Sequence, residues 1–210
     1  MSIIEEIISN WRKTPRGPAP KIEEEDIATI LRLLIEEETM GRYEMAKNTG
    51  INQGTIRGLM ERMKQRRLIK TSRKGCRITM KGIEALNNYL RRRRIREIKI
   101  LSKTEIWNLA PGENVAAVLV EGKFSNKIDG IKQRDEALKS GAEGATTLIV
   151  EEGEIKFPRT GEPIKKFYPR EEAYLKMKMN PKNGQIIIIC WGKTVAKAIK
   201  GAIKAAETLI

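Results

Sequence analysis

The sequence predicts an α+β protein of two domains, and three observations lead to this prediction. The chain has 210 residues, of which 40% are apolar, and this is enough to fill two cores. Its first half shows helical periodicity followed by two short strands, and its second half alternates strand and helix signals. The charge is uneven, because residues 41–100 hold 18 Lys and Arg against 4 Asp and Glu, an excess equal to the whole net charge of +14. We therefore expect a folded basic surface within residues 41–100.

Composition argues against several classes of protein. No run of about 18 apolar residues is present, and Glu5 and Glu6 stand where a signal peptide would be basic, so we expect a soluble, cytoplasmic protein with no membrane partner. The chain has no histidine, which removes the commonest general base and most transition-metal ligands. Cys76 and Cys190 lack C-x-x-C spacing and are expected to be reduced thiols. We therefore expect a protein that is not an enzyme, with no catalytic residue, metal or cofactor.

Residues 1–20 are expected to form a helical arm and a Pro-rich linker. The apolar residues of the arm fall on one helical face, and the Pro-rich stretch 14–20 then ends any helix. That face consists of Ile3, Ile4, Ile7, Ile8 and Trp11. It has to dock, and two alternatives are open, a dimer partner or the chain's own core. Acidic residues 23–26 then begin a first core helix, which continues at amphipathic spacing through Ile27, Ile30, Leu31, Leu34 and Ile35.

Residues 41–68 carry the spacing of two short helices around a tight turn. Ala46, Gly50 and Ile56 follow one another at intervals of four and six. In a helix-turn-helix the small residue lets the helices pack closely, the glycine takes the left-handed conformation, and the apolar residue anchors the second helix. The other inward positions are expected to be Met45, Ile51, Leu59, Met60 and Met63.

Residues 69–78 predict a hairpin of two strands around a glycine, and a new helix is expected from Thr79 to about residue 96. A hairpin in this position is the wing of a winged helix-turn-helix. We therefore assign residues 21–96 to a winged helix-turn-helix domain that binds DNA, and we expect a linker near residues 97–104.

Residues 97–210 predict a small mixed α/β domain for dimerisation or ligand sensing. Strands are expected at 115–120 and 145–150, with a hairpin at 151–157. The continuously apolar run 186–190 is typical of a buried central strand. Helices are expected within 129–142, over 171–179, and from Thr194 to the end of the chain.

Two tetrapeptides carry a resemblance to known regulators. Gly54-Thr55-Ile56-Arg57 resembles a recognition helix, and Thr79-Met80-Lys81-Gly82 resembles the helix start after the wing in winged helix-turn-helix regulators. With residues 134–158 and the final strand and helix, the chain resembles a family of uncharacterised archaeal two-domain proteins, and its abundance of Lys, Arg, Glu and Ile is thermophile-like. The resemblance implies this architecture and, through the fold, DNA binding. It implies no ligand or activity for the C-terminal domain.

The second helix of the motif presents side chains that suit base edges. Arg57 has the forked guanidinium that pairs with guanine O6 and N7, and the amides of Asn52 and Gln53 suit adenine. Asn52 has an alternative role as the helix N-cap, and Gly54 and Gly58 serve either groove entry or packing. The candidate DNA-binding residues are Asn52, Gln53, Thr55, Arg57, Arg62, Lys64, Arg66, Lys70, Arg73, Lys74 and Arg77.

The cations of this set differ in position. Those on the wing, which are Lys70, Arg73, Lys74 and Arg77, can reach phosphates or a narrow minor groove. Arg62 and Arg66, with the neighbouring Arg67, are expected to flank the groove. The run from Arg91 to Arg94 has two open interpretations, a DNA contact or a solvated face with a part in subunit electrostatics.

A candidate ligand site lies late in the chain. Gly192, Lys193 and Thr194 follow a buried strand and open a helix, like the end of a phosphate-binding loop, but Ile187 stands where that loop needs a glycine. The nucleotide-binding motif is therefore absent, although the helix N-terminus beside Trp191 suits a small anionic effector. The alternative is that Trp191 is a core residue and that the turn only joins strand to helix.

Three functions compete at this point. The leading one is a homodimeric transcriptional regulator that places two recognition helices on a two-fold site in double-stranded DNA. The second is an RNA-binding or nucleoprotein accessory protein that uses the same winged helix. The third is an enzyme with a DNA-binding appendage, for which Asp135 and Glu136 form the available carboxylate pair.

Overall fold

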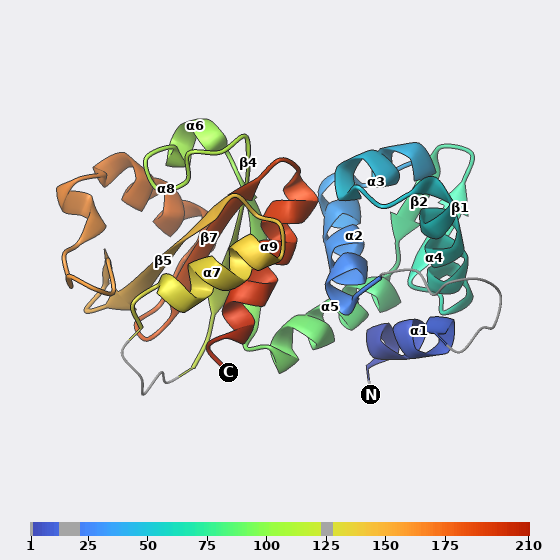
Figure 1. The fold of residues 1–210 in the computed structure, drawn as a ribbon, viewed down its shortest axis with the longest axis horizontal. Helices are drawn as coiled ribbons and strands as arrows, with labels where there is room; N and C mark the ends of the chain where they lie inside the picture. The colour runs from blue at the N-terminus through green and yellow to red at the C-terminus, as the bar shows by residue number, and fades with distance from the viewer. Residues whose placement is uncertain (1, 13–21, 123–127) are drawn as a thin grey trace. The chain divides into compact units, whose positions relative to one another are not determined.

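The structure is a computed structural model that describes residues 2–12, 22–122 and 128–210. The chain divides into two compact units, Met1–Leu90 and Arg91–Ile210. Both units contain helices and an antiparallel sheet, of two strands in the first and five in the second, which confirms the α+β class (Figure 1). Within the described ranges no helix is long and apolar enough to cross a membrane.

The N-terminal unit contains helices and one hairpin at the positions expected from the sequence. Its elements are α1 (Ile3–Arg12), α2 (Glu24–Glu36), α3 (Arg42–Thr49), α4 (Gln53–Gln65), β1 (Ile69–Ser72), β2 (Gly75–Ile78) and α5 (Met80–Arg92). The Pro-rich stretch 14–20 lies outside the described residues.

Helix α1 docks on its own unit. Ile4 and Ile7 are 0% and 2% exposed, and α1 contacts α2, whose Ile27, Leu31 and Leu34 are fully buried. The apolar face of the arm is therefore covered by the chain itself, which answers the alternative left open by its periodicity.

The turn between α3 and α4 has the predicted conformation. Gly50 adopts a left-handed φ of 72°, which a residue without a Cβ takes at no steric cost, and its N–H donates to the Ala46 carbonyl at 2.9 Å. Two residues later, Asn52 caps α4, because its Oδ1 accepts a hydrogen bond of 2.8 Å from the Thr55 N–H. These two contacts set the direction in which α4 leaves the turn.

The β1–β2 hairpin is tied to the helices through its second strand. Met40, between α2 and α3, pairs with Cys76 through two backbone hydrogen bonds of 3.0 and 3.1 Å. The Cys76 thiol also donates to the Met40 carbonyl, and burial raises the pKa of this thiol to about 11, so it stays protonated at neutral pH. Arg73 and Lys74 form the two-residue turn at the tip of the hairpin, and both side chains are exposed to solvent.

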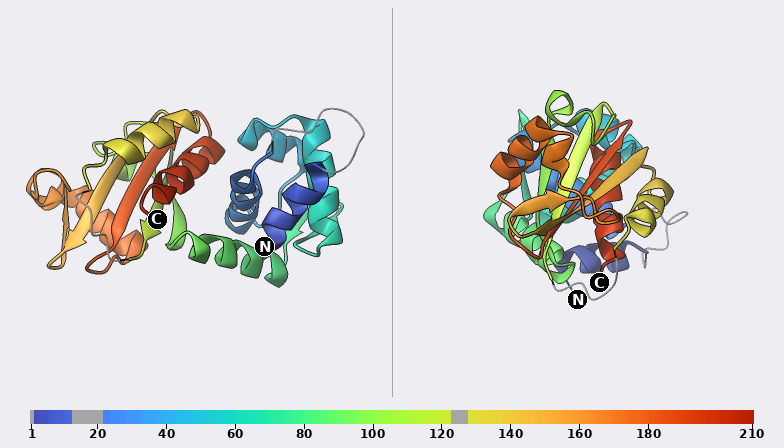
Figure 2. Two further views of the ribbon diagram at one scale, coloured as in Figure 1. Left: turned by 60° about the horizontal axis from the view of Figure 1, so that its bottom comes forward. Right: turned by 90° about the vertical axis from the view of Figure 1, so that its left-hand side faces the viewer.

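The C-terminal unit is built on one five-stranded sheet. Its strands are β3 (Ile95–Leu101), β4 (Asn114–Val120), β5 (Gly144–Glu151), β6 (Glu154–Lys156) and β7 (Ile186–Gly192), and its helices are α6 (Lys103–Ile106), α7 (Ile131–Lys139), η1 (Ile164–Lys166), α8 (Pro169–Met179) and α9 (Val195–Glu207). The strand order is β3-β4-β7-β5-β6, so the apolar strand β7 is central as predicted. Figure 2 shows α7 and α9 together on one face of this sheet.

The start of this unit differs from the sequence prediction. Helix α5 ends at Arg92 and β3 begins at Ile95, so the helix expected to residue 96 and the linker expected at 97–104 are wrong. Arg94 has a left-handed φ of 52°, which ends the helix. In the strand that follows, Ile98 pairs with Val118 of β4, and both side chains are buried. The second unit therefore begins earlier than the expected boundary at 97.

All pairings in the five-stranded sheet are antiparallel. The candidate ligand site at Gly192–Thr194 was expected partly because ligands often bind outside the carboxyl ends of strands in open α/β sheets, which are mostly parallel, and this sheet does not have that arrangement. Trp191, at the end of β7, packs against the core and against the backbone of Gly112 and Gly144. A Cβ on Gly144 would overlap the Trp191 ring, so this contact needs glycine.

Replacing Gly144 with alanine is expected to force the Trp191 ring out of place. The free energy of unfolding should fall by about 1–3 kcal/mol, as in other overpacked cores. Urea denaturation followed by tryptophan fluorescence measures this change. The control Glu143→Ala, at an exposed neighbouring position, should stay within about 0.5 kcal/mol of the wild type. Equal stability of Gly144→Ala and the control would contradict the packing described for Trp191.

Candidate nucleic-acid interface

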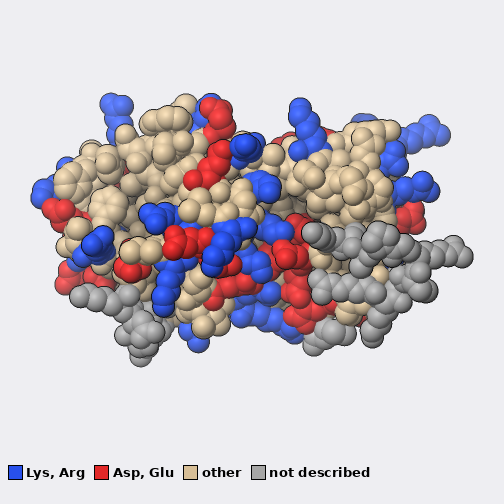
Figure 3. Space-filling model, viewed as in Figure 1, with Lys and Arg blue, Asp and Glu red and all other residues tan. Residues whose placement is uncertain are grey.

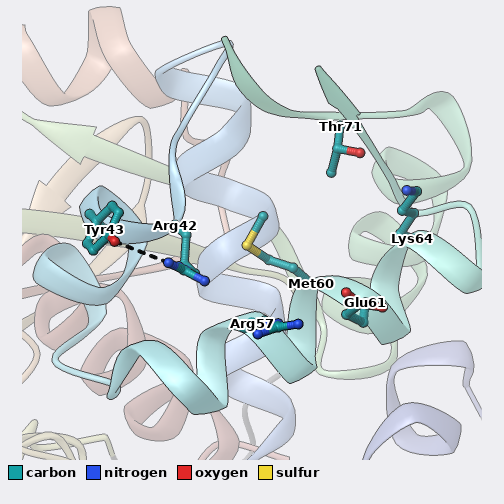
Figure 4. A pocket seen from close by; sticks show the side chains of 7 residues that line it. All are labelled: Arg42, Tyr43, Arg57, Met60, Glu61, Lys64 and Thr71. Atoms are coloured by element: carbon teal, nitrogen blue, oxygen red, sulfur yellow. Dashed lines mark hydrogen bonds between the residues drawn. The ribbon is translucent and has the colours of Figure 1, made fainter. Parts of the chain in front are cut away.

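Three elements of the N-terminal unit surround a hollow of about 440 Å³ (Figure 4). Helix α3 lines it with its first two residues, α4 with its exposed side, and β1 with one residue. The lining side chains are Arg42, Tyr43, Arg57, Met60, Glu61, Lys64 and Thr71. We call this hollow the α3–α4–β1 groove.

The α4 side of the groove follows from helix geometry. Arg57, Met60, Glu61 and Lys64 are spaced by three and four residues, which places them on one face. Ile56, Leu59 and Met63 lie on a different face of α4 and are fully buried. The groove therefore lies on the solvent-facing side of α4, whose inner side packs in the hydrophobic core.

The chemistry of the groove is basic with an aromatic component. It holds three cations, Arg42, Arg57 and Lys64, against the single carboxylate of Glu61. Tyr43 is 66% exposed, and the Arg42 guanidinium lies 5.0 Å from the centre of its ring and donates to its hydroxyl at 3.2 Å. A cationic wall with an exposed phenol can bind the phosphates and sugars of a nucleic-acid backbone.

The predicted site residues on the hairpin are exposed beside this groove. Lys70, Arg73, Lys74 and Arg77 are all exposed, and the Arg77 Nε donates to Thr39 Oγ1 at 2.9 Å. Figure 3 shows Lys and Arg side chains along the edge of the N-terminal unit at which α3, α4 and the hairpin lie. The groove and the hairpin together form the basic surface expected from the charge distribution.

Other predicted residues lie away from the groove. Asn52 is the helix cap, which was its alternative role, while Gln53 is exposed and Thr55 half-buried at the start of α4. Arg62 and Arg66 are held by α1 through contacts with Trp11 and Glu6. The structure brings together Arg57 and Lys64 of the predicted set.

Four groove residues, Arg42, Tyr43, Glu61 and Thr71, were not among the predicted site residues, and Met60 was misplaced. Met60 was expected in the core, but it is half-buried and lines the groove, because it lies on the edge of the inward face of α4. Arg42, Tyr43 and Thr71 come from α3 and β1, whose contribution depends on how the hairpin folds back. An available signal was an aromatic residue in the first turn of a short polar helix, where no core position requires one.

The polar groups at the turn after β7 form hydrogen bonds within the protein. Gly192 pairs with Asn114 in the sheet, and the Asn114 amide donates to the carbonyls of Gly192 and Lys193 at 3.2 and 3.1 Å. The Thr194 hydroxyl accepts from the Lys197 N–H at 3.2 Å as the cap of α9. The interpretation of Trp191 as a core residue agrees with its packing.

The acidic residues of α7 form surface ion pairs. Asp135 pairs with Arg134 at 3.4 Å and Glu136 pairs with Lys139 at 3.2 Å, and the first pair is more than half exposed. Within residues 2–12, 22–122 and 128–210, no three Cys, Asp or Glu side chains cluster as metal ligands would.

Comparisons with known proteins give relatives for both units but no activity. Residues 111–209 match a family model described as a domain of unknown function, DUF4443. A solved structure, "Hypothetical protein PH0730 from Pyrococcus horikoshii OT3", is 31% identical, covers 90% of this chain and 93% of its own, and has a TM-score of 0.69. Among curated proteins no match was found. The resemblance to archaeal proteins is confirmed by the solved structure.

Gly54 offers a test of whether the outer face of α4 contacts a ligand. A Cβ at this position would meet nothing closer than Asn52 Oδ1 at 3.4 Å, so Gly54→Ala should raise the free energy of unfolding by about 0.5–1 kcal/mol. If this face of α4 contacts base edges, the added methyl group should lower the affinity for duplex DNA. Thermal denaturation and fluorescence anisotropy measure the two quantities. A stabilised variant with unchanged affinity would contradict this role of the outer face.

Proposed function

The chain belongs to the same family as the hypothetical protein PH0730, and we propose that its N-terminal unit binds double-stranded DNA as the winged helix-turn-helix of a transcriptional regulator. The observation that carries this proposal is the α3–α4–β1 groove, in which cations from two helices converge beside a basic hairpin. The C-terminal unit would then supply dimerisation, since two-fold DNA sites are bound by paired recognition helices.

Helix α4 has the form that insertion into DNA requires. An α-helix with its side chains is about 10–12 Å across, and the major groove of B-DNA is about 12 Å wide. The exposed face of α4 carries the small residue Gly54 and the forked side chain of Arg57. With α4 in the major groove of the DNA, Arg57 would contact a guanine base. Arg73 and Lys74, at the hairpin tip, would reach the flanking phosphates.

DNA binding is expected to depend strongly on salt. If about six cations of the groove and hairpin contact phosphates, the log-log slope of affinity against salt is about −5, and affinity falls roughly a thousandfold between 50 and 200 mM. Fluorescence anisotropy on a random duplex DNA measures this slope. Duplex RNA of equal length serves as competitor, and stronger competition by RNA than by DNA would favour the RNA-binding alternative. A flat salt response would contradict phosphate contacts altogether.

Base-reading and phosphate-binding residues are expected to respond differently to substitution. Arg57→Ala should relax preference at one base pair, at a cost of about 1–3 kcal/mol on the preferred site. Arg73→Ala combined with Lys74→Ala should weaken binding to specific and random duplexes by the same factor and reduce the salt slope. Titrations of both variants on both duplexes measure these effects. Identical behaviour of the two variants would show that α4 is not oriented as proposed.

A further inference from the structure

Helix α1 contacts the flank of α4 through an aromatic side chain. The Arg62 guanidinium lies 4.2 Å from the centre of the Trp11 ring, and its Nη1 donates to the Gly58 carbonyl at 3.2 Å. The Trp11 ring also covers Gly58, where an added Cβ would lie 3.1 Å from Trp11 Cζ2. Gly58 therefore serves packing against α1, and the missing side chain makes room for this tryptophan.

An ion pair joins the first half of α1 to the C-terminal cap of α4. Glu6 Oε1 lies 2.5 Å from Arg66 Nη1, and both side chains are 35% exposed. Trp11 thus meets the middle of α4 and Glu6 meets its C-terminal end, so α1 follows the second half of α4 in the opposite chain direction. Both arginines were expected to flank the DNA, and both are occupied within the protein.

We propose that α1 is a built-in restraint on DNA binding, an inference that rests on the function proposed above. The major groove, about 12 Å wide, accepts one helix and leaves no room for a second one beside it. Trp11 covers one flank of α4, and Glu6 neutralises a cation that would otherwise face phosphate. The buried side chains of Ile4 and Ile7 anchor the opposite side of α1, so α1 does not detach from the N-terminal unit spontaneously.

Two substitutions release the restraint by different means. Glu6→Gln keeps the size of the side chain and frees Arg66, and Trp11→Ala frees Arg62 and uncovers Gly58. Each full-length variant should bind duplex DNA about 3- to 10-fold more tightly at low salt, and the salt slope should steepen by about 0.9 for each freed arginine. Glu84→Gln, at an exposed position of α5, removes an equal charge and serves as the control. Thermal denaturation verifies that the variants are folded.

The outcomes separate this inference from the proposed function. Tighter and more salt-dependent binding by Glu6→Gln, beyond that of Glu84→Gln, supports the restraint, and so does binding that appears only in the released variants. If the wild type binds and both variants bind equally well or more weakly, the restraint is overturned while the proposed function stands. If no form binds duplex DNA at 50 mM salt, the proposed function fails and the restraint fails with it.

Discussion

The burial of one side of α4 is the constraint on which the candidate interface depends. Ile56, Leu59 and Met63 are fully buried, and together they prevent the helix from rotating about its axis. Burying three side chains of this size stabilises the unit by several kcal/mol, at about 1.5–3 kcal/mol each. The groove cations of α4, Arg57 and Lys64, are by contrast held in place only because α4 is held. The position of Arg57 is therefore a consequence of apolar packing on the buried face of α4.

Two further contacts complete the interface around this helix. The turn at Gly50 sets where α4 begins, and the pairing of Met40 with Cys76 sets where the hairpin stands. Neither contact involves a charged side chain. The basic residues consequently lie on a frame built from backbone hydrogen bonds and apolar burial, which allows them to be exposed to solvent without cost to the fold.

Helices α3 and α4 and the turn between them could be predicted from the sequence because their signals are local. The interval from Ala46 through Gly50 to Ile56 predicts a turn that the φ of Gly50 confirms. The groove was not predicted as a unit, since Tyr43 and Thr71 meet only after the hairpin folds back onto the helices. Spacing along one helix cannot reveal a neighbour that comes from another element.

The C-terminal unit shows a second limit of local patterns. Strand β3 was missed because the arginine run before it extends the helical pattern, and only the left-handed conformation of Arg94 ends the helix. The pairing directions and the strand order were not predicted, because a pattern of strands and helices does not by itself determine which strands are neighbours. The central strand β7 was predicted correctly because a run of isoleucines has few alternatives to a buried position.

We propose that the α3–α4–β1 groove and the hairpin form the DNA-binding surface. NMR titration of the isotope-labelled protein with duplex DNA tests it most directly, by mapping the chemical-shift changes onto the chain. The account predicts that the largest changes occur at Arg42, Arg57 and Lys64 and at the hairpin tip, with small changes at exposed cations of the C-terminal unit such as Arg159 and Arg170. Changes confined to the C-terminal unit, or none at low salt, would contradict it.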